Sequence, residues 1–130
     1  MGKFVKHVSE LDVCRLAFEA QQEIFLHSKR FPKEEIYSLT DQIRRSSRSI
    51  GANLCEAWAK RRYPAHFSSK LTDADSEREE TLHWLATALA CKYIVDTCAS
   101  RITDRLNQIG SMINMMIAHA DDWCIAQKSP

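Results

Sequence analysis

The stretch QIRRSSRSIGANLCEA, residues 42–57, carries the clearest structural signal in the chain. Between its regularly spaced apolar residues, the stretch holds three arginines and several small side chains, where a solvated helix usually carries Lys and Glu. Small residues allow a second backbone to approach closely, and arginines bind carboxylates or phosphates through paired hydrogen bonds. We therefore expect this helix to dock on another surface. Its apolar residues recur three, four or seven positions apart, which is one stripe of an α-helix; they are Ile36, Leu39, Ile43, Ile50, Leu54 and Ala57.

Three more segments have helical periodicity, and breaks near Phe31-Pro32 and Tyr63-Pro64 separate the first three helices. No segment alternates with the period of two that is typical of a strand. The first helix is expected to bury Leu11, Cys14, Ala17, Phe18, Ile24 and Phe25. Long helices with short links favour an antiparallel up-down-up-down four-helix bundle, so we predict one all-α domain over residues 1–130. The predicted helices cover about residues 10–29, 33–61, 65–96 and 102–124.

The charge of the chain is nearly balanced overall but is unevenly distributed. Its 130 residues include 18 Lys and Arg against 17 Asp and Glu, a net charge of +1. This balance argues against a general nucleic-acid binder, which is usually strongly basic. Residues 1–62 have a net charge of +4 and residues 63–130 of −3. Two interpretations of this asymmetry remain open: the charges are solvated or paired within the bundle, or they form a polarised binding surface.

The cysteines and the lack of targeting signals in the sequence indicate in which cellular compartment the protein is expected. The five cysteines are an odd number without a Cys-x-x-Cys pair, so we interpret them as buried, reduced thiols. No apolar run approaches the roughly 20 residues that cross a bilayer, and no signal-peptide pattern opens the sequence. We therefore expect a soluble cytoplasmic protein without membrane contact.

The sequence contains no convincing catalytic or metal-binding pattern. Glu80-x-x-His83 is half of the motif that di-iron bundles carry twice, and no second copy exists. The serines near residue 47 have arginines beside them but no histidine, and no glycine-rich phosphate loop occurs. We predict a protein that is not an enzyme and has no cofactor, and a metal-dependent enzyme using Glu80 and His83 is the least favoured alternative.

Several motifs in order resemble the bacterial 23S rRNA intervening-sequence proteins, a four-helix-bundle family. The resemblance spans about residues 13–118. Residues 91–94 lack the glycine that commonly precedes Tyr-Ile in the family, which predicts that the third helix extends further before the chain turns. The matching motifs are residues 31–35, residues 37–40, the helix-two stretch that begins at Gln42, residues 80–85 (ETLHWL) and residues 109–114 (IGSMIN).

The resemblance implies a bundle that assembles into a ring, commonly a homopentamer. It also implies an origin in open reading frames, some of which lie within inserts of 23S ribosomal RNA genes. A structurally similar protein is the accessory component of diversity-generating retroelements, a basic pentamer that engages reverse transcriptase and nucleic acid. The family has no established catalytic residues, so the resemblance assigns none here.

Two functions remain open. The first is a self-assembling scaffold or adaptor of unknown partner. The second is a protein that binds ribosomal or other structured RNA, or an RNA-handling protein. The basic residues available for RNA are Arg44, Arg45, Arg48, Lys60, Arg61 and Arg62.

One face of the second helix is predicted to meet a neighbouring subunit. At about 100° per residue, this face lies roughly 130–170° from the apolar stripe, so it cannot serve the core. Its members are Arg45, Arg48, Ser49, Ala52 and Glu56. We expect its arginines to pair with the acidic middle of the third helix in the next subunit, which comprises Asp73, Asp75, Glu77, Glu79 and Glu80.

Overall fold

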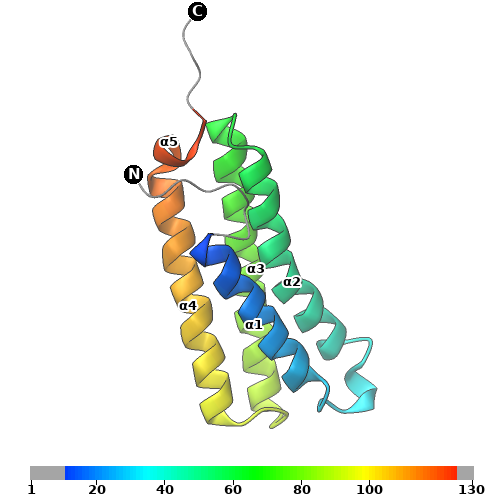
Figure 1. The fold of residues 1–130 in the computed structure, drawn as a ribbon. Coiled ribbons are helices and arrows are strands. Elements are labelled where there is room, and N and C mark those ends of the chain that lie inside the picture. The colour runs from blue at the N-terminus through cyan, green and yellow to red at the C-terminus, as the bar shows by residue number, and fades with distance from the viewer. Residues whose placement is uncertain (1–10, 126–130) are drawn as a thin grey trace, which may run out of the picture.

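The computed structural model describes residues 11–125 and is built of helices joined by short turns (Figure 1). Helix makes up 83% of the structure, and residues 11–125 contain no strand, which confirms the all-α prediction. The predicted start at Glu10 and both ends of the 1–130 domain lie outside the described residues. The elements are α1 (Asp12–Ser28), the 3-10 helix η2 (Lys33–Glu35), α2 (Leu39–Ala59), α3 (Pro64–Ala90), α4 (Asp96–Ala118) and α5 (Ala120–Trp123).

The four long helices lie side by side as a bundle. In Figure 1, α1 and α3 descend, whereas α2 and α4 return toward the upper end. Both α2 and α4 pack against α1 and against α3, and the short α5 caps the upper end against α3. All four long helices therefore contribute to one core between them.

The core consists of aliphatic side chains from every long helix, with Phe67 as its fully buried ring. On α3 and α4 the core residues include Leu71, Leu85, Ile109 and Ile113, which are all buried. On α1 the prediction is wrong at Phe18, whose side chain is 59% exposed. The reason is that α1 carries apolar residues around much of its circumference, while its neighbours cover only the side that holds Ala17, Ala20 and Ile24.

The second long helix begins later than predicted, at Leu39 instead of about residue 33. The 3-10 turn Lys33–Glu35 comes first, and Glu35 then binds the start of α2. Its Oε1 accepts hydrogen bonds from Ser38 Oγ at 2.7 Å and from the Leu39 amide at 3.4 Å. Because that carboxylate satisfies an amide of the first helical turn, the chain can start a new helix at this point.

The third helix ends earlier than predicted, at Ala90 instead of about residue 96. Lys92 has a φ of 63°, a left-handed conformation that usually belongs to glycine. The amide of Tyr93 donates to the Ala88 carbonyl at 2.9 Å, and the amide of Lys92 donates to the Leu89 carbonyl at 3.0 Å. These two bonds are those of a Schellman motif, so the helix stops without the glycine whose absence had predicted a longer α3. The fourth helix accordingly starts at Asp96, earlier than the predicted residue 102.

A buried arginine lies between α3 and α4. The Arg78 side chain is 8% exposed, and its Nε donates to Asp75 at 2.8 Å. A Cβ atom placed on Gly110 of α4 would lie 2.5 Å from the Arg78 Cζ. The guanidinium group therefore occupies the space that a side chain at position 110 would need.

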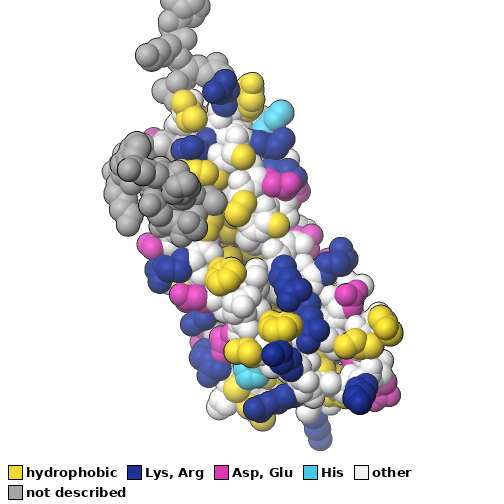
Figure 2. All heavy atoms as spheres, turned by 45° about the vertical axis from the view of Figure 1, so that its right-hand side comes forward, with side chains coloured by type: hydrophobic (Ala, Val, Ile, Leu, Met, Phe, Trp, Pro, Cys, Tyr) yellow, Lys and Arg dark blue, Asp and Glu magenta, His cyan; other side chains and the backbone are white. Residues whose placement is uncertain are grey.

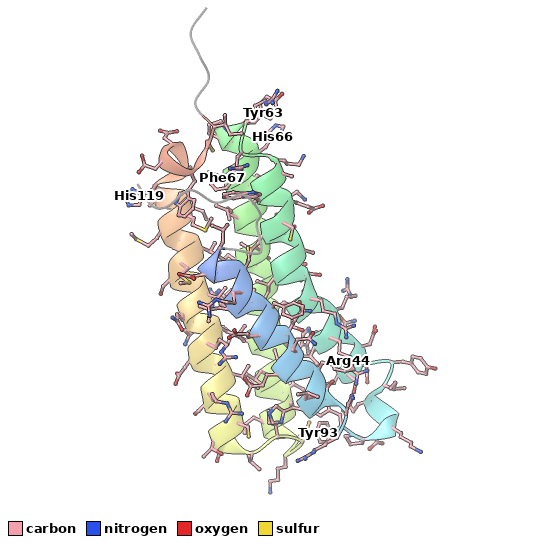
Figure 3. All side chains as sticks on the ribbon, in the orientation of Figure 1. Arg44, Tyr63, His66, Phe67, Tyr93 and His119 are labelled. Carbon is pink, nitrogen blue, oxygen red and sulfur yellow. The ribbon has the colours of Figure 1, made fainter. Side chains whose placement is uncertain are left out.

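The two connections at the lower end of the bundle are linked through Tyr93. Its hydroxyl donates to the Glu35 Oε2 at 2.9 Å, and its ring lies 5.6 Å from the Phe31 ring. This hydrogen bond raises the pKa of Tyr93 to about 12 and lowers the pKa of Glu35, together with the bond from Ser38. The α1–α2 and α3–α4 connections are therefore joined although Glu35 and Tyr93 lie 58 residues apart in the sequence. Figure 3 shows Tyr93 at the lower end of the bundle.

Candidate interaction surface

The predicted contact face of α2 lies outside the core. Arg45, Arg48, Ala52 and Glu56 are exposed, and Ser49 is half-buried. Their placement agrees with the helical wheel. Their role in contacts between subunits stays a prediction, because the structure contains one copy of the chain.

The two arginines of this face point to different neighbours. The electrostatic influence of Arg45 reaches Glu77 of α3 and opposes the burial that raises the Glu77 pKa. The guanidinium of Arg48 instead lies over the Phe25 ring of α1. The helical wheel placed these arginines together, whereas the packing of α2 between α1 and α3 separates their charged ends.

Three of the five acidic residues in the middle of α3 have basic partners within the same chain. Asp73 lies 3.7 Å from Lys70, whose Nζ also lies 3.1 Å from Glu56 of α2. Asp75 and Glu79 both contact Arg78. These contacts supply in one subunit much of the pairing that the sequence suggested between subunits.

Two of the small residues of α2 face the interior. Ser46 and Ser47 are buried, and the Thr81 hydroxyl donates to Ser46 Oγ at 2.9 Å. Thr81 is itself completely buried on α3. Small side chains in this part of α2 therefore allow close packing of the protein's own helices, while Ala52 remains on the outside.

Three cations surround one aromatic ring where α1 meets α2. The distances to the Phe25 ring centre are 4.9 Å from Lys29 Nζ, 4.8 Å from Arg44 Cζ and 5.3 Å from Arg48 Cζ. Arg44 Nε also donates to Ser28 Oγ at 2.8 Å, and Ser28 donates to the Phe25 carbonyl at 2.7 Å. We call these five residues the Phe25 cluster.

The Phe25 cluster has no acidic partner in the described part of the chain. Neither Lys29, Arg44 nor Arg48 lies within 4 Å of a carboxylate of residues 11–125. Figure 2 shows Lys and Arg side chains gathered beside hydrophobic ones on the lower half of this face. Sequence reasoning assigned Phe25 to the core, whereas its side chain is half-buried, and it did not consider Lys29. Their spacing of four along the chain was the available signal, but only the packing of α1 on α2 reveals the cluster.

The other predicted basic residues lie at the opposite end of α2. Arg61 lies 3.6 Å over the Trp58 ring, and its Nε donates to the Trp58 carbonyl at 2.9 Å. Lys60 and Arg62 are exposed beside it. Figure 3 shows Arg44 near one end of the bundle and Tyr63 near the other. The six basic residues of the sequence prediction therefore form two separate groups.

Exposed apolar side chains on α1 form a second feature of this region. Phe18 is 59% exposed and Leu26 is 62% exposed, and both project from the side of α1 that its neighbours leave uncovered. We call these two residues the α1 ridge. Because two large apolar side chains project from one uncovered side of α1, the ridge is a candidate surface for protein contact.

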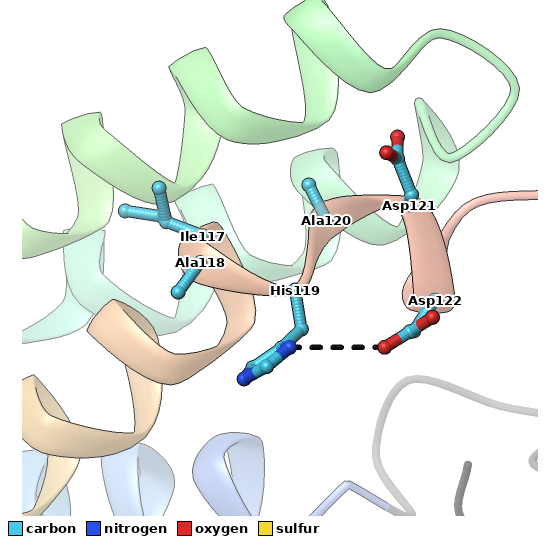
Figure 4. Close-up of a pocket in the computed structure, with 6 residues that line it drawn as sticks. All are labelled: Ile117, Ala118, His119, Ala120, Asp121 and Asp122. Atoms are coloured by element: carbon cyan, nitrogen blue, oxygen red, sulfur yellow. Dashed lines mark ion pairs between the residues drawn. The ribbon is translucent and has the colours of Figure 1, made fainter.

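Two other groups of polar side chains lie outside the surfaces described above. Glu80 Oε2 accepts a hydrogen bond from the Trp84 ring nitrogen at 3.2 Å, and His83 lies edge-on to that ring. A shallow pocket at the α4–α5 junction contains His119 and Asp122, 3.8 Å apart and both more than half exposed (Figure 4). In residues 11–125 no three metal-ligating side chains gather at one point.

The cysteines differ in exposure. Burial, with Cys55 nearby, raises the pKa of Cys14 to about 12, so its thiol stays protonated at neutral pH. Cys55 and Cys91 are exposed, in contrast to the predicted burial of the thiols. Both occupy solvent-facing positions at or beyond the edge of their helices' apolar stripes.

Comparisons with known proteins agree with this architecture. Residues 9–115 match the family model described as 23S rRNA-intervening sequence protein. The chain is similar to a protein of unknown function from the S23 ribosomal protein family of Bacteroides thetaiotaomicron, with 29% identity and a TM-score of 0.74. That likeness covers 82% of this chain and 95% of the other. A search of curated proteins found no match.

None of the helices formed by residues 11–125 is long and apolar enough to span a membrane. The family match covers most of the chain, including all of α1, α2 and α3 and most of α4. The protein belongs to the 23S rRNA-intervening sequence protein family.

Proposed function

We propose that the protein is a non-enzymatic scaffold or adaptor that assembles with copies of itself in the cytoplasm. Its building block is the antiparallel four-helix bundle, whose long sides can align with those of neighbouring copies. The resemblance to its family favours a closed ring, with five subunits as the preferred number.

The α1 ridge is the observation that carries this proposal. Phe18 and Leu26 leave more than half of two large apolar side chains in water. Covering them with a second copy would remove that surface from water, at roughly 25 cal/mol for each Å². Aromatic residues and arginine are enriched at the centres of protein interfaces. The α1 ridge lies on the same helix as Phe25, and Arg44 and Arg48 of α2 lie over the Phe25 ring.

The exposed face of α2 extends the proposed contact. Ala52 presents a single methyl group between longer side chains, so another helix can approach closely there. Arg45, Arg48, Ser49 and Glu56 surround it with polar groups. This arrangement corresponds to an interface with an apolar part and a polar rim.

Light scattering coupled to gel filtration tests the proposal on the wild-type chain and on a Phe18→Glu/Leu26→Glu variant. The wild type should elute as a defined oligomer at micromolar concentration, and the variant as a monomer with unchanged circular dichroism. An Ala52→Trp variant should also dissociate, because the larger ring blocks close approach.

Val95→Glu/Met115→Glu is the matched control, since Val95 in the α3–α4 connection and Met115 on α4 are 63% and 59% exposed. This variant should keep the oligomer. A monomeric wild type, or equal dissociation of both double variants, would contradict an interface centred on α1 and α2.

Binding of RNA is the second candidate function, and the absence of an acidic partner for the Phe25 cluster favours it. Six phosphate contacts, from Arg44, Arg45, Arg48, Lys60, Arg61 and Arg62, would give a slope of roughly −4 to −5 in log K against log salt. Titration of the wild-type chain with structured ribosomal RNA measures that slope. Absence of binding at low salt would leave the scaffold function alone.

A further inference from the structure

We propose that the Phe25 cluster is a phosphate-binding site for the backbone of single-stranded RNA, an inference that rests on the second candidate function. The geometry that points to it is the convergence of three cations on one ring. Like charges repel one another, and a protein usually places a carboxylate among them. In residues 11–125 no carboxylate approaches these three groups closely enough to pair.

The cluster holds its arginines in place before any ligand arrives. The Ser28 hydroxyl accepts from Arg44 Nε, so the two terminal nitrogens of that guanidinium remain available for an outside acceptor. Phe25 holds Arg44 and Arg48 through cation–π contacts. Since these arginines are four residues apart, they lie about 6 Å apart along the axis of α2. Two positioned guanidinium groups can each take two phosphate oxygens.

The arrangement favours phosphate over stacked bases or a protein partner. Cations already lie over the Phe25 ring, which leaves its surface poorly available for a base. A chain of phosphates brings one negative charge with every nucleotide, and that density matches three adjacent cations. An acidic protein segment would bring its charges on separate flexible side chains.

Fluorescence anisotropy with a labelled 12-nucleotide oligouridine tests the site. Three phosphate contacts should give the wild-type chain a slope of roughly −2 in log K against log salt, at about −0.7 per contact on a single strand. Arg44→Gln/Arg48→Gln leaves only Lys29, so the slope should fall to roughly −0.7.

Arg15→Gln/Arg101→Gln is the charge-matched control, because it also removes two arginine charges. Both of these have carboxylate partners in the chain, Arg15 with Asp12 and Arg101 with Glu23. Binding by this control should stay within about twofold of the wild type, because its arginines already have acidic partners. Equal loss in the two variants would overturn the site and leave RNA binding as a general charge effect.

Phe25→Leu separates positioning from charge, since it keeps all three cations and removes the ring that orders them. Its affinity for the oligouridine should fall about fivefold, the scale of one or two exposed cation–π contacts. Unchanged affinity would overturn the role of the ring.

An oligoglutamate peptide of equal charge distinguishes the ligand class. Tighter binding of this peptide than of the RNA would overturn the proposal in favour of an acidic protein partner. Failure of the wild type to bind the oligouridine at low salt would overturn the site, whereas the titration with structured ribosomal RNA decides separately whether the protein binds RNA. Light scattering on the same samples measures self-assembly, so the scaffold function is tested separately from RNA binding.

Discussion

Gly110 shows how one side chain can restrict the residue type on a neighbouring helix. Arg78 lies where a Cβ on residue 110 would be, and its burial prevents an easy retreat into water. The sequence shows a glycine inside a helical pattern, where it normally costs about 1 kcal/mol relative to alanine. Glycine occurs here despite that cost because any larger residue at position 110 would collide with the Arg78 guanidinium.

Replacing the two helical glycines should have opposite effects on stability. Gly110→Ala should lower the free energy of unfolding by about 1–3 kcal/mol, because the new methyl group displaces a buried guanidinium. Gly51→Ala is the matched control, since its Cβ would meet only Gln21 Oε1 at an ordinary 3.9 Å. That variant should gain about 1 kcal/mol from helix propensity. Urea unfolding measures both, and a stabilised Gly110→Ala would contradict the placement of Arg78.

At the scale of elements, the periodicity of the sequence predicted correctly that four long helices form, but it predicted less accurately the residues at which they begin and end. Four long helices occur where the apolar stripes required them. The end of α3 differs because Lys92 adopts a left-handed conformation, and its two backbone bonds satisfy carbonyls of the last turn. Glycine is not obligatory for this motif. A lysine can take its place when the following Tyr93 is held by Phe31 and Glu35.

Lys92→Gly should stabilise the protein, because glycine adopts a positive φ without the clash of a Cβ. The expected gain is about 1 kcal/mol, at the lower end of the cost of a left-handed residue. Thermal unfolding should show a rise in Tm of about 3 °C for a chain of this length. Lys60→Gly is the control at the end of α2, where φ is −103°, and it should give no gain. Equal shifts in the two variants would argue against strain at Lys92.

At the scale of the whole molecule, several ion pairs join different helices within one chain. Lys70 connects α3 to Glu56 of α2, and Arg101 and Arg105 of α4 contact Glu23 of α1. These pairs join bases of the −3 half to acids of the +4 half, so the excess charge of each half remains. The Phe25 cluster belongs to the basic half, and none of its cations forms an ion pair within residues 11–125.

Self-assembly should resist salt. Because Asp73, Asp75 and Glu79 of α3 already have partners within the subunit, the proposed contact depends chiefly on apolar surface, which salt does not screen. Between 0.1 and 1 M NaCl, the dissociation constant between subunits should change by less than about threefold, although the Debye length falls from about 10 Å to 3 Å. Analytical ultracentrifugation measures this constant. Dissociation at 1 M NaCl would instead support the sequence-based prediction of arginine–carboxylate pairs between subunits.

Helix type, number and order follow from the sequence because the spacing of apolar residues along a helix is a local property. Local spacing also places Ala52 and Arg45 outside the core. The surroundings of Phe18, Phe25 and Arg78 depend on how neighbouring helices pack, and a wheel of one helix contains no information about its neighbours.

The Phe25 cluster illustrates this limit. It joins Lys29 to Arg44 and Arg48 across the contact between α1 and α2. These residues come together only when α1 and α2 pack with one particular axial shift and rotation relative to each other. The amino-acid sequence thus determines the bundle through local periodicity, whereas the candidate site arises from long-range packing, because its charges come from two helices separated by a turn.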